Sequence, residues 1–217
     1  PAIRLHLGLQ SQKKAHDSCF DSCSRSSIKR QRHFSFINSD HPRPPMQRFA
    51  ALYRALDAST SSLAKQAALQ DYLRAAPPAD AAWAVYFLAG GKPRQLVPTR
   101  VLREQARAAA GLPEWLFDES YEAVGDLAET ISLLLPEPAA PVQRPLTDWL
   151  LHHLLPLRGL PPEALHARLA EQWRELAADD RLVYFKLITG AFRVGVSKLP
   201  VTQALAAVSG VDAKPVA

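Results

Sequence analysis

The chain has 217 residues, of which 47% are hydrophobic, enough for one folded domain with a substantial core. No run approaches the roughly 18 consecutive apolar residues of a membrane-spanning helix, so we expect no membrane partner. The net charge of +5 arises entirely in residues 1–45, which hold eight basic and three acidic side chains. The remainder is neutral overall, so the basic pI does not identify a partner for the folded part.

Residues 1–45 differ in composition from the rest of the chain. They are rich in Ser, Arg and His and show no sustained hydrophobic period, so we expect a disordered or non-native leader. The domain is expected over residues 46–211, followed by the truncated start of a linker at 212–217. The two cysteines, Cys19 and Cys23, lie in the leader and form too weak a pattern with nearby histidines for zinc. We therefore expect no metal, and a cysteine-free domain that suits a bacterial cytoplasm.

Helical periodicity dominates from Met46 onward, with glycine and proline at the expected helix ends. The first helix is predicted from Phe49, Leu52, Tyr53 and Leu56, which share one face. The second helix is expected to run to Ala75 with Thr60 or Ser61 as its cap, the third over 81–89 with Asp80 as its cap, and the fourth over 99–110 with Thr99 as its cap. Further helices are expected from Pro113, from Asp126 with Glu129 as its capping-box partner, and over 146–157, 161–177, 181–189 and 198–209. The pattern predicts an all-α fold of about ten short helices in two similar halves, joined by the proline-rich residues 136–145.

Charge is segregated along the folded part. Residues 92–107 hold five basic side chains and one acid, residues 181–198 hold four basic side chains and no acid, and residues 114–137 hold seven acids and no base. This distribution is compatible with one positive and one negative face, and equally with ordinary solvated faces.

The segment over residues 190–198 combines features that favour anion binding. Gly190 is expected to end one helix, and Ser197 to cap the helix that begins at Lys198, whose N-terminus offers unpaired N–H groups. Arg193 and Lys198 add positive charge, and Gly195 leaves the backbone uncovered. The alternative is a plain helix-to-helix turn.

The segment over residues 90–100 repeats this arrangement. Gly91 follows a helix, Lys92 and Arg94 occupy the loop, and Arg100 lies at the start of the next helix. The segment lacks the G-x4-G-K-[ST] pattern of a nucleotide-binding loop. Two basic, glycine-containing segments at helix starts suggest contacts to a repeating polyanion.

The remaining polar residues favour structural roles. Asp126 is interpreted as a helix cap. Asp148 and His152 are expected to share a helix face four residues apart, with too few partners for a metal site. No arrangement for a serine or cysteine nucleophile is present.

Several of these stretches resemble the N-terminal DNA-binding domain of ATP-dependent DNA ligases. They are "GDLAETISLLL", "YFKLITGAFRVGVS" and "QALAAVSG", and "PPADAAWAVYFLAGGKPRQLVPTR" is similar to the bacterial branch. The resemblance covers roughly residues 46–211. Pro200 departs from it, since relatives often carry a polar residue there.

The resemblance implies a monomeric all-α domain that grips nicked or duplex DNA by its sugar–phosphate backbone without reading bases. It implies a parent enzyme that acts in DNA repair, recombination and replication. The residues expected to contact DNA phosphates are Gly91, Lys92, Arg94 and Arg100 in one segment, and Gly190, Arg193, Gly195, Ser197 and Lys198 in the other.

Ligase chemistry requires a lysine in a Lys-x-Asp-Gly setting, and this sequence contains none. We therefore expect the chain to be inactive alone and to need no cofactor. The resemblance implies that ATP, Mg²⁺, the adenylation domain and the OB-fold domain belong to other parts of a parent enzyme. One alternative is an α-helical protein-interaction module that uses the acidic residues 114–137 or an apolar groove. A helix-turn-helix regulator is disfavoured, because residues 201–210 are too rich in alanine to read bases.

Overall fold

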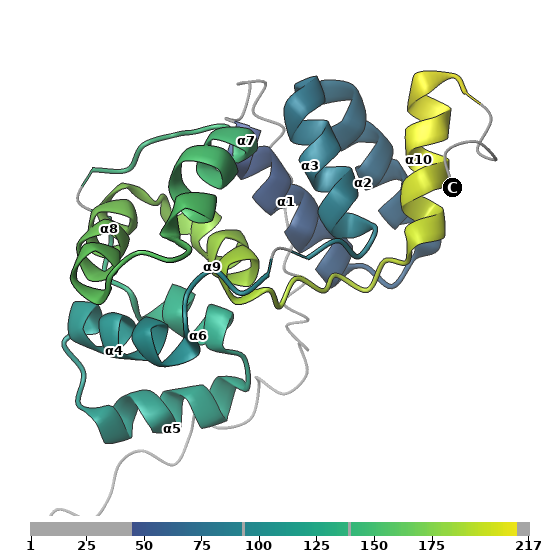
Figure 1. The fold of residues 1–217 in the computed structure, drawn as a ribbon. Coiled ribbons are helices and arrows are strands. Elements are labelled where there is room, and N and C mark those ends of the chain that lie inside the picture. The colour runs from purple at the N-terminus through teal and green to yellow at the C-terminus, as the bar shows by residue number, and fades with distance from the viewer. Residues whose placement is uncertain (1–44, 93, 139, 212–217) are drawn as a thin grey trace, which may run out of the picture. The chain divides into compact units, whose positions relative to one another are not determined.

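The computed structural model describes residues 45–92, 94–138 and 140–211 (Figure 1). Within these ranges the fold is entirely helical and no strand forms, which confirms the predicted class. The helices are α1 (Pro45–Ala58), α2 (Ser62–Ala75), α3 (Pro78–Leu88), α4 (Thr99–Ala110), α5 (Glu114–Val124), α6 (Leu127–Leu134), α7 (Leu146–Asp148), η1 (Trp149–Leu154), η2 (Leu155–Leu157), α8 (Pro162–Glu175), η3 (Ala178–Asp180), α9 (Arg181–Thr189) and α10 (Lys198–Ser209). None of the described helices combines the length and apolar character that a bilayer crossing demands. The predictions for residues 1–44 and 212–217 lie outside the described residues.

The helices pack in two groups. In one group α2 packs against α1 and α10, and α10 also contacts α3. In the other, α6 packs against α9, α5 and α4, and α4 contacts α8. Helix α1 also contacts α7 and α9, so the two groups share one continuous core. Each group contains helices from both sides of residues 136–145. The last helix, α10, returns to α2 and α3, whereas α8 and α9 pack against α4 and α6 (Figure 1).

Local capping signals placed several helix ends correctly. Ser61 accepts a hydrogen bond from the amide of Ala64 (3.3 Å), and Asp126 accepts one from the amide of Glu129 (3.0 Å). Gly111 and Gly190 end α4 and α9 in the left-handed region, with φ of 66° and 70°. These ends are encoded within a few residues of where they occur.

Two predicted caps were wrong. Helix α4 starts at Thr99, so Thr99 lies inside the first turn, and its hydroxyl accepts a hydrogen bond from the Gln95 amide group instead (3.1 Å). Helix α3 starts before Asp80, at Pro78. The buried Asp80 carboxylate accepts from the amide and the hydroxyl of Thr147 (2.9 and 2.6 Å), so it stabilises the start of α7.

A π-helix changes the expected pairing of the histidines. Residues Trp149–Leu154 form η1, in which hydrogen bonds run from residue i to i+5 rather than i+4. The widened turn places His153, not His152, beside Asp148, with 3.6 Å between Nε2 and Oδ2. The prediction that Asp148 and His152 share a face was therefore wrong. Burial lowers the pKa of His153, and Arg144 lowers it further.

Candidate nucleic-acid interface

The 190–198 segment connects α9 to α10 and alternates between buried and exposed side chains. Phe192 and Val194 are buried, whereas Arg193, Gly195 and Ser197 are exposed. The alternation anchors the segment through its apolar residues and turns three of the predicted phosphate contacts toward solvent.

Two side chains from the first helices hold this segment by its backbone. The hydroxyl of Tyr53 (α1) donates to the carbonyl oxygen of Arg193 (3.2 Å), and Nζ of Lys65 (α2) donates to that of Gly195 (3.0 Å). Burial, with Asp57 and other acids adding to it, raises the pKa of Tyr53 to about 12, so the phenol keeps the proton that it donates.

An aromatic cluster lies under the same segment. The ring of Phe192 stacks on Phe49 (centroids 5.6 Å apart), meets Tyr53 edge-on (5.1 Å) and lies 5.9 Å from Phe87. These contacts tie the backbone around Arg193 to α1 and α3, so Arg193 projects from a fixed base.

The start of α10 differs in one respect from its prediction. Ser197 occupies the N-cap position, as expected, but its hydroxyl makes no capping hydrogen bond to the helix. Its backbone is extended, with φ of −87° and ψ of 169°. The capping interaction predicted for Ser197 was therefore wrong, although the boundary of the helix was right.

The 90–100 segment lies beside the 190–198 segment. The amide of Leu96 donates to the carbonyl of Ile188 (3.5 Å), two residues before Gly190. Leu96 and Val97 are buried, whereas Lys92 and Arg94 are exposed. Figure 1 shows both segments running between the two groups of helices. The two basic segments are thus brought together, as their common interpretation requires.

A further basic residue joins the 90–100 segment from a distant part of the chain. The exposed Arg158, which follows η2, donates from its guanidinium to the carbonyl oxygen of Arg94 (3.4 Å). The hydrogen bond places the charge of Arg158 close to the backbone of Arg94.

Gly91 has a packing role in this segment. A Cβ atom on Gly91 would lie 2.5 Å from the carbonyl oxygen of Tyr86 and 2.7 Å from its ring. The Gly91 amide also donates to that carbonyl (2.8 Å), so the close approach is part of the turn after α3.

We expect Gly91→Ala to lower the free energy of unfolding by about 1–3 kcal/mol, because the new methyl group forces the backbone apart. Urea denaturation followed by circular dichroism measures the change. An unchanged denaturation midpoint would show that the turn has room for a side chain.

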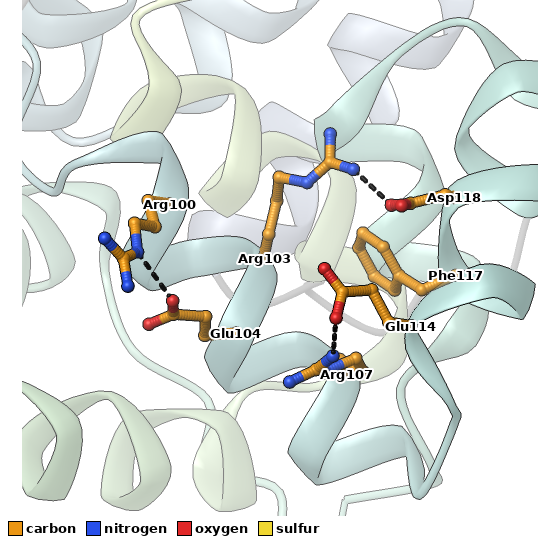
Figure 2. A pocket seen from close by; sticks show the side chains of 7 residues that line it. All are labelled: Arg100, Arg103, Glu104, Arg107, Glu114, Phe117 and Asp118. Carbon is orange, nitrogen blue, oxygen red and sulfur yellow. Dashed lines mark hydrogen bonds and ion pairs between the residues drawn. The ribbon is translucent and has the colours of Figure 1, made fainter.

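Of the other predicted contacts, Lys198 is exposed at the first position of α10. Arg100 lies on α4 and forms an ion pair with Glu104 one turn later (2.7 Å). Nearby, residues of α4 and α5 line an open cavity of about 600 Å³. Figure 2 shows three arginines there, each facing a carboxylate. The lining residues are Arg100, Arg103, Glu104, Arg107, Glu114, Phe117 and Asp118. Three positive and three negative side chains balance, so this cavity has no net charge with which to attract an anion.

The segregated charges of the sequence therefore neutralise each other in the fold. Arg103 pairs with Asp118, and Arg107 pairs with Glu114 (2.9 Å), which joins the basic helix α4 to the acidic helix α5. Lys186 of α9 pairs with Asp126 (2.7 Å). Burial alone would raise the pKa of Asp126, but Lys186 and the Glu129 amide outweigh it and hold the pKa below its ordinary value.

The 90–100 and 190–198 segments differ from most of the remaining surface in the pairing of their cations with carboxylates. Many cations elsewhere have a carboxylate partner: Arg54, Arg74, Arg100, Arg103, Arg107, Arg144, Arg168 and Lys186. In the described ranges, no carboxylate pairs with Lys65, Lys92, Arg94, Arg158 or Arg193. The guanidinium of Arg193 makes no hydrogen bond or ion pair with any described residue. These five unpaired cations thus gather at the 90–100 and 190–198 segments, whereas Arg174 of α8, which is also exposed and has no carboxylate partner among the described residues, lies outside both.

Sequence reasoning found three of these five cations and missed Lys65 and Arg158. Both are separated from their segments by dozens of residues and carry no local motif. Lys65 reaches the site because α2 packs against α10. Arg158 reaches it because the 155–159 turn packs against the 90–100 segment.

The chain matches a known protein family. The family model described as the DNA ligase N terminus matches residues 45–206. A search of the curated proteins found none that matches the chain.

Proposed function

The chain belongs to the DNA ligase N-terminal family, and on that premise we propose that it binds nicked or duplex DNA through the sugar–phosphate backbone, without sequence preference. In this proposal Lys92, Arg94 and Arg193 contact phosphates. The exposed backbone around Gly195 and Ser197 lies against the same strand. Contacts of this kind position a protein on a duplex but carry no sequence information.

The observation that carries the proposal is the gathering of cations without carboxylate partners at two adjacent segments. A cation already paired with a carboxylate must give up that partner before it binds a phosphate, whereas Arg193 is exposed and has none. The 190–198 segment is also held in place by Tyr53 and Lys65 before any ligand arrives. A preorganised site loses less conformational entropy on binding.

We expect Arg193→Ala to weaken DNA binding equally for unrelated sequences. We also expect the salt exponent, which is the steepness with which the logarithm of the binding constant falls with the logarithm of the salt concentration, to drop by about 0.9, the value for one lost phosphate contact. Fluorescence anisotropy with nicked duplexes of two different sequences, titrated at several salt concentrations, measures both quantities.

The matched control is Arg168→Ala. It removes the same charge from α8, where Arg168 pairs with Glu171 (2.8 Å) outside both segments. Equal losses for the two variants would mean that net charge alone drives binding. A wild-type chain whose DNA binding does not respond to salt would overturn the proposed function.

We further propose that the domain serves a cytoplasmic, ATP-dependent ligase in repair, recombination and replication, and that it acts as a monomer. No catalytic step is assigned to this chain, because its sequence contains no Lys-x-Asp-Gly setting for an adenylated lysine. In the proposal, ATP and Mg²⁺ act in the adenylation and OB-fold domains of a parent enzyme. The alternative of a protein-interaction module that uses its acidic residues is weakened, because three acids of residues 114–137 already pair with Arg103, Arg107 and Lys186.

A further inference from the structure

We infer that Lys65 is part of the DNA-binding site and acts there in two ways: it positions the 190–198 segment, and it supplies a second positive charge beside Arg193. This inference rests on the proposed function and adds to it a residue from α2, outside both sequence segments.

The positioning role follows from two hydrogen bonds to alternate carbonyl groups. Tyr53 binds the carbonyl of Arg193 at 3.2 Å, and Lys65 binds the carbonyl of Gly195 at 3.0 Å. Gly195 has a φ of 57°, a conformation that residues other than glycine adopt rarely, so the chain changes direction where Lys65 holds it. Without the ammonium, the carbonyl of Gly195 would lose this hydrogen bond. The buried Phe192 and Val194 and the Tyr53 hydroxyl would still anchor the segment, so Gly195 is the point at which it could shift.

The charge role follows from the donors that Lys65 has left. An ammonium group has three N–H donors, and the Gly195 carbonyl accepts from one of them. Lys65 is partly exposed, and no described carboxylate pairs with it. Its remaining donors are therefore available to a phosphate oxygen that approaches the exposed backbone of Gly195.

Gly195 keeps that approach open. A Cβ atom added at Gly195 would lie 3.4 Å from Nζ of Lys65. Any longer side chain at this position would extend beside the ammonium group and block a ligand from the N–H donors of Lys65. The absent side chain thus leaves the carbonyl and the ammonium accessible side by side.

The test compares Lys65→Met, which keeps the length of the side chain but removes charge and donor, with Lys65→Arg, which keeps both. Binding of the 217-residue chain to a nicked duplex is measured at several salt concentrations. We expect Lys65→Met to weaken binding roughly tenfold at low salt, as for a lost hydrogen bond to a charged group. We also expect its salt exponent to fall by about 0.9, and Lys65→Arg to retain most of the affinity.

The positioning role has its own readout in the double variant Lys65→Met/Arg193→Ala. Because a displaced segment already weakens the Arg193 contact, the double variant should lose less affinity than the product of the two single losses. Strictly multiplicative losses would overturn the positioning role.

The control is Arg74→Ala, which removes one charge from the other end of α2, where Arg74 pairs with Asp71 (3.1 Å). Thermal unfolding of each variant checks that the fold is intact. If Lys65→Met binds like wild type at every salt concentration while Arg193→Ala binds weakly, the inference about Lys65 is overturned and the proposed function stands. If the wild-type chain shows no salt-sensitive binding, both fail.

Discussion

Replacing Phe192 with alanine is expected to lower the free energy of unfolding by about 3–5 kcal/mol, the usual cost of deleting a buried aromatic ring. Phe192 is 4% exposed and contacts the rings of Phe49, Tyr53 and Phe87, which come from two different helices. The cavity would open directly under Arg193. Urea denaturation monitored by circular dichroism measures the loss.

The control for Phe192→Ala is Leu63→Ala. The side chain of Leu63 is 84% exposed, so its removal should change stability by less than about 0.5 kcal/mol. Phe192→Leu should cost less than Phe192→Ala, because leucine fills part of the space. A stability of Phe192→Ala within 1 kcal/mol of wild type, roughly the scale of an average substitution, would mean that the aromatic cluster does not anchor the segment.

The second large effect is expected at Asp180, whose carboxyl group is buried (1% exposed) and whose two oxygens have no hydrogen-bond partner among the described residues. Burial raises its pKa from 3.8 to about 7, with Asp179 adding to the rise and Arg54 opposing it. The folded state therefore holds a proton that the unfolded state loses as pH rises above about 4. Asp180 makes stability fall between that pH and about 7, and the full penalty persists at higher pH.

We expect Asp180→Asn to remove this penalty and to stabilise the protein at pH 8 by up to about 4 kcal/mol, since one pKa unit corresponds to about 1.4 kcal/mol. Near pH 4 the variant and the wild type should have almost the same stability. Thermal or urea denaturation at a series of pH values measures the difference between them.

Asp71→Asn is the control, because Asp71 is exposed, forms a surface ion pair with Arg74 (3.1 Å) and is not among the charges that shift the pKa of Asp180. Exposed pairs contribute little, so this variant should follow the wild-type pH profile closely. A difference between Asp180→Asn and wild type that is independent of pH would show that the Asp180 carboxyl does not titrate in this range.

The all-α class and many helix ends could be predicted from the sequence because their causes are local. The apolar period of α1 lies within one stretch of 14 residues, and Asp126 caps α6 through an amide three residues away. Gly190 ends α9 because glycine adopts the left-handed conformation without a steric penalty. Such features depend on neighbours in sequence, so no knowledge of the fold is needed.

The features that the sequence did not predict depend on contacts between distant residues. Asp80 looks like the cap of its own helix, but the fold offers it the unpaired amide of Thr147 instead. The basic and acidic segments look like separate surfaces until α5 packs beside α4 and pairs Arg103 with Asp118. Lys65 and Arg158 carry no motif at all. The sequence therefore predicted the part of the candidate site around Arg193 and Arg94, but it did not predict the residues that other helices contribute.

The return of α10 to α2 has a consequence for the order in which this protein folds during synthesis. Among the described helices, α1, α2 and α3 are synthesised before the others, and α10, which covers one side of α2, is synthesised last. Until then, apolar surface on α2 stays open to water, where nascent chains are prone to aggregate. The closing step joins residues far apart in the chain, and contacts of this kind slow folding. We therefore expect a chaperone to stay bound to the nascent chain of this protein until α10 emerges.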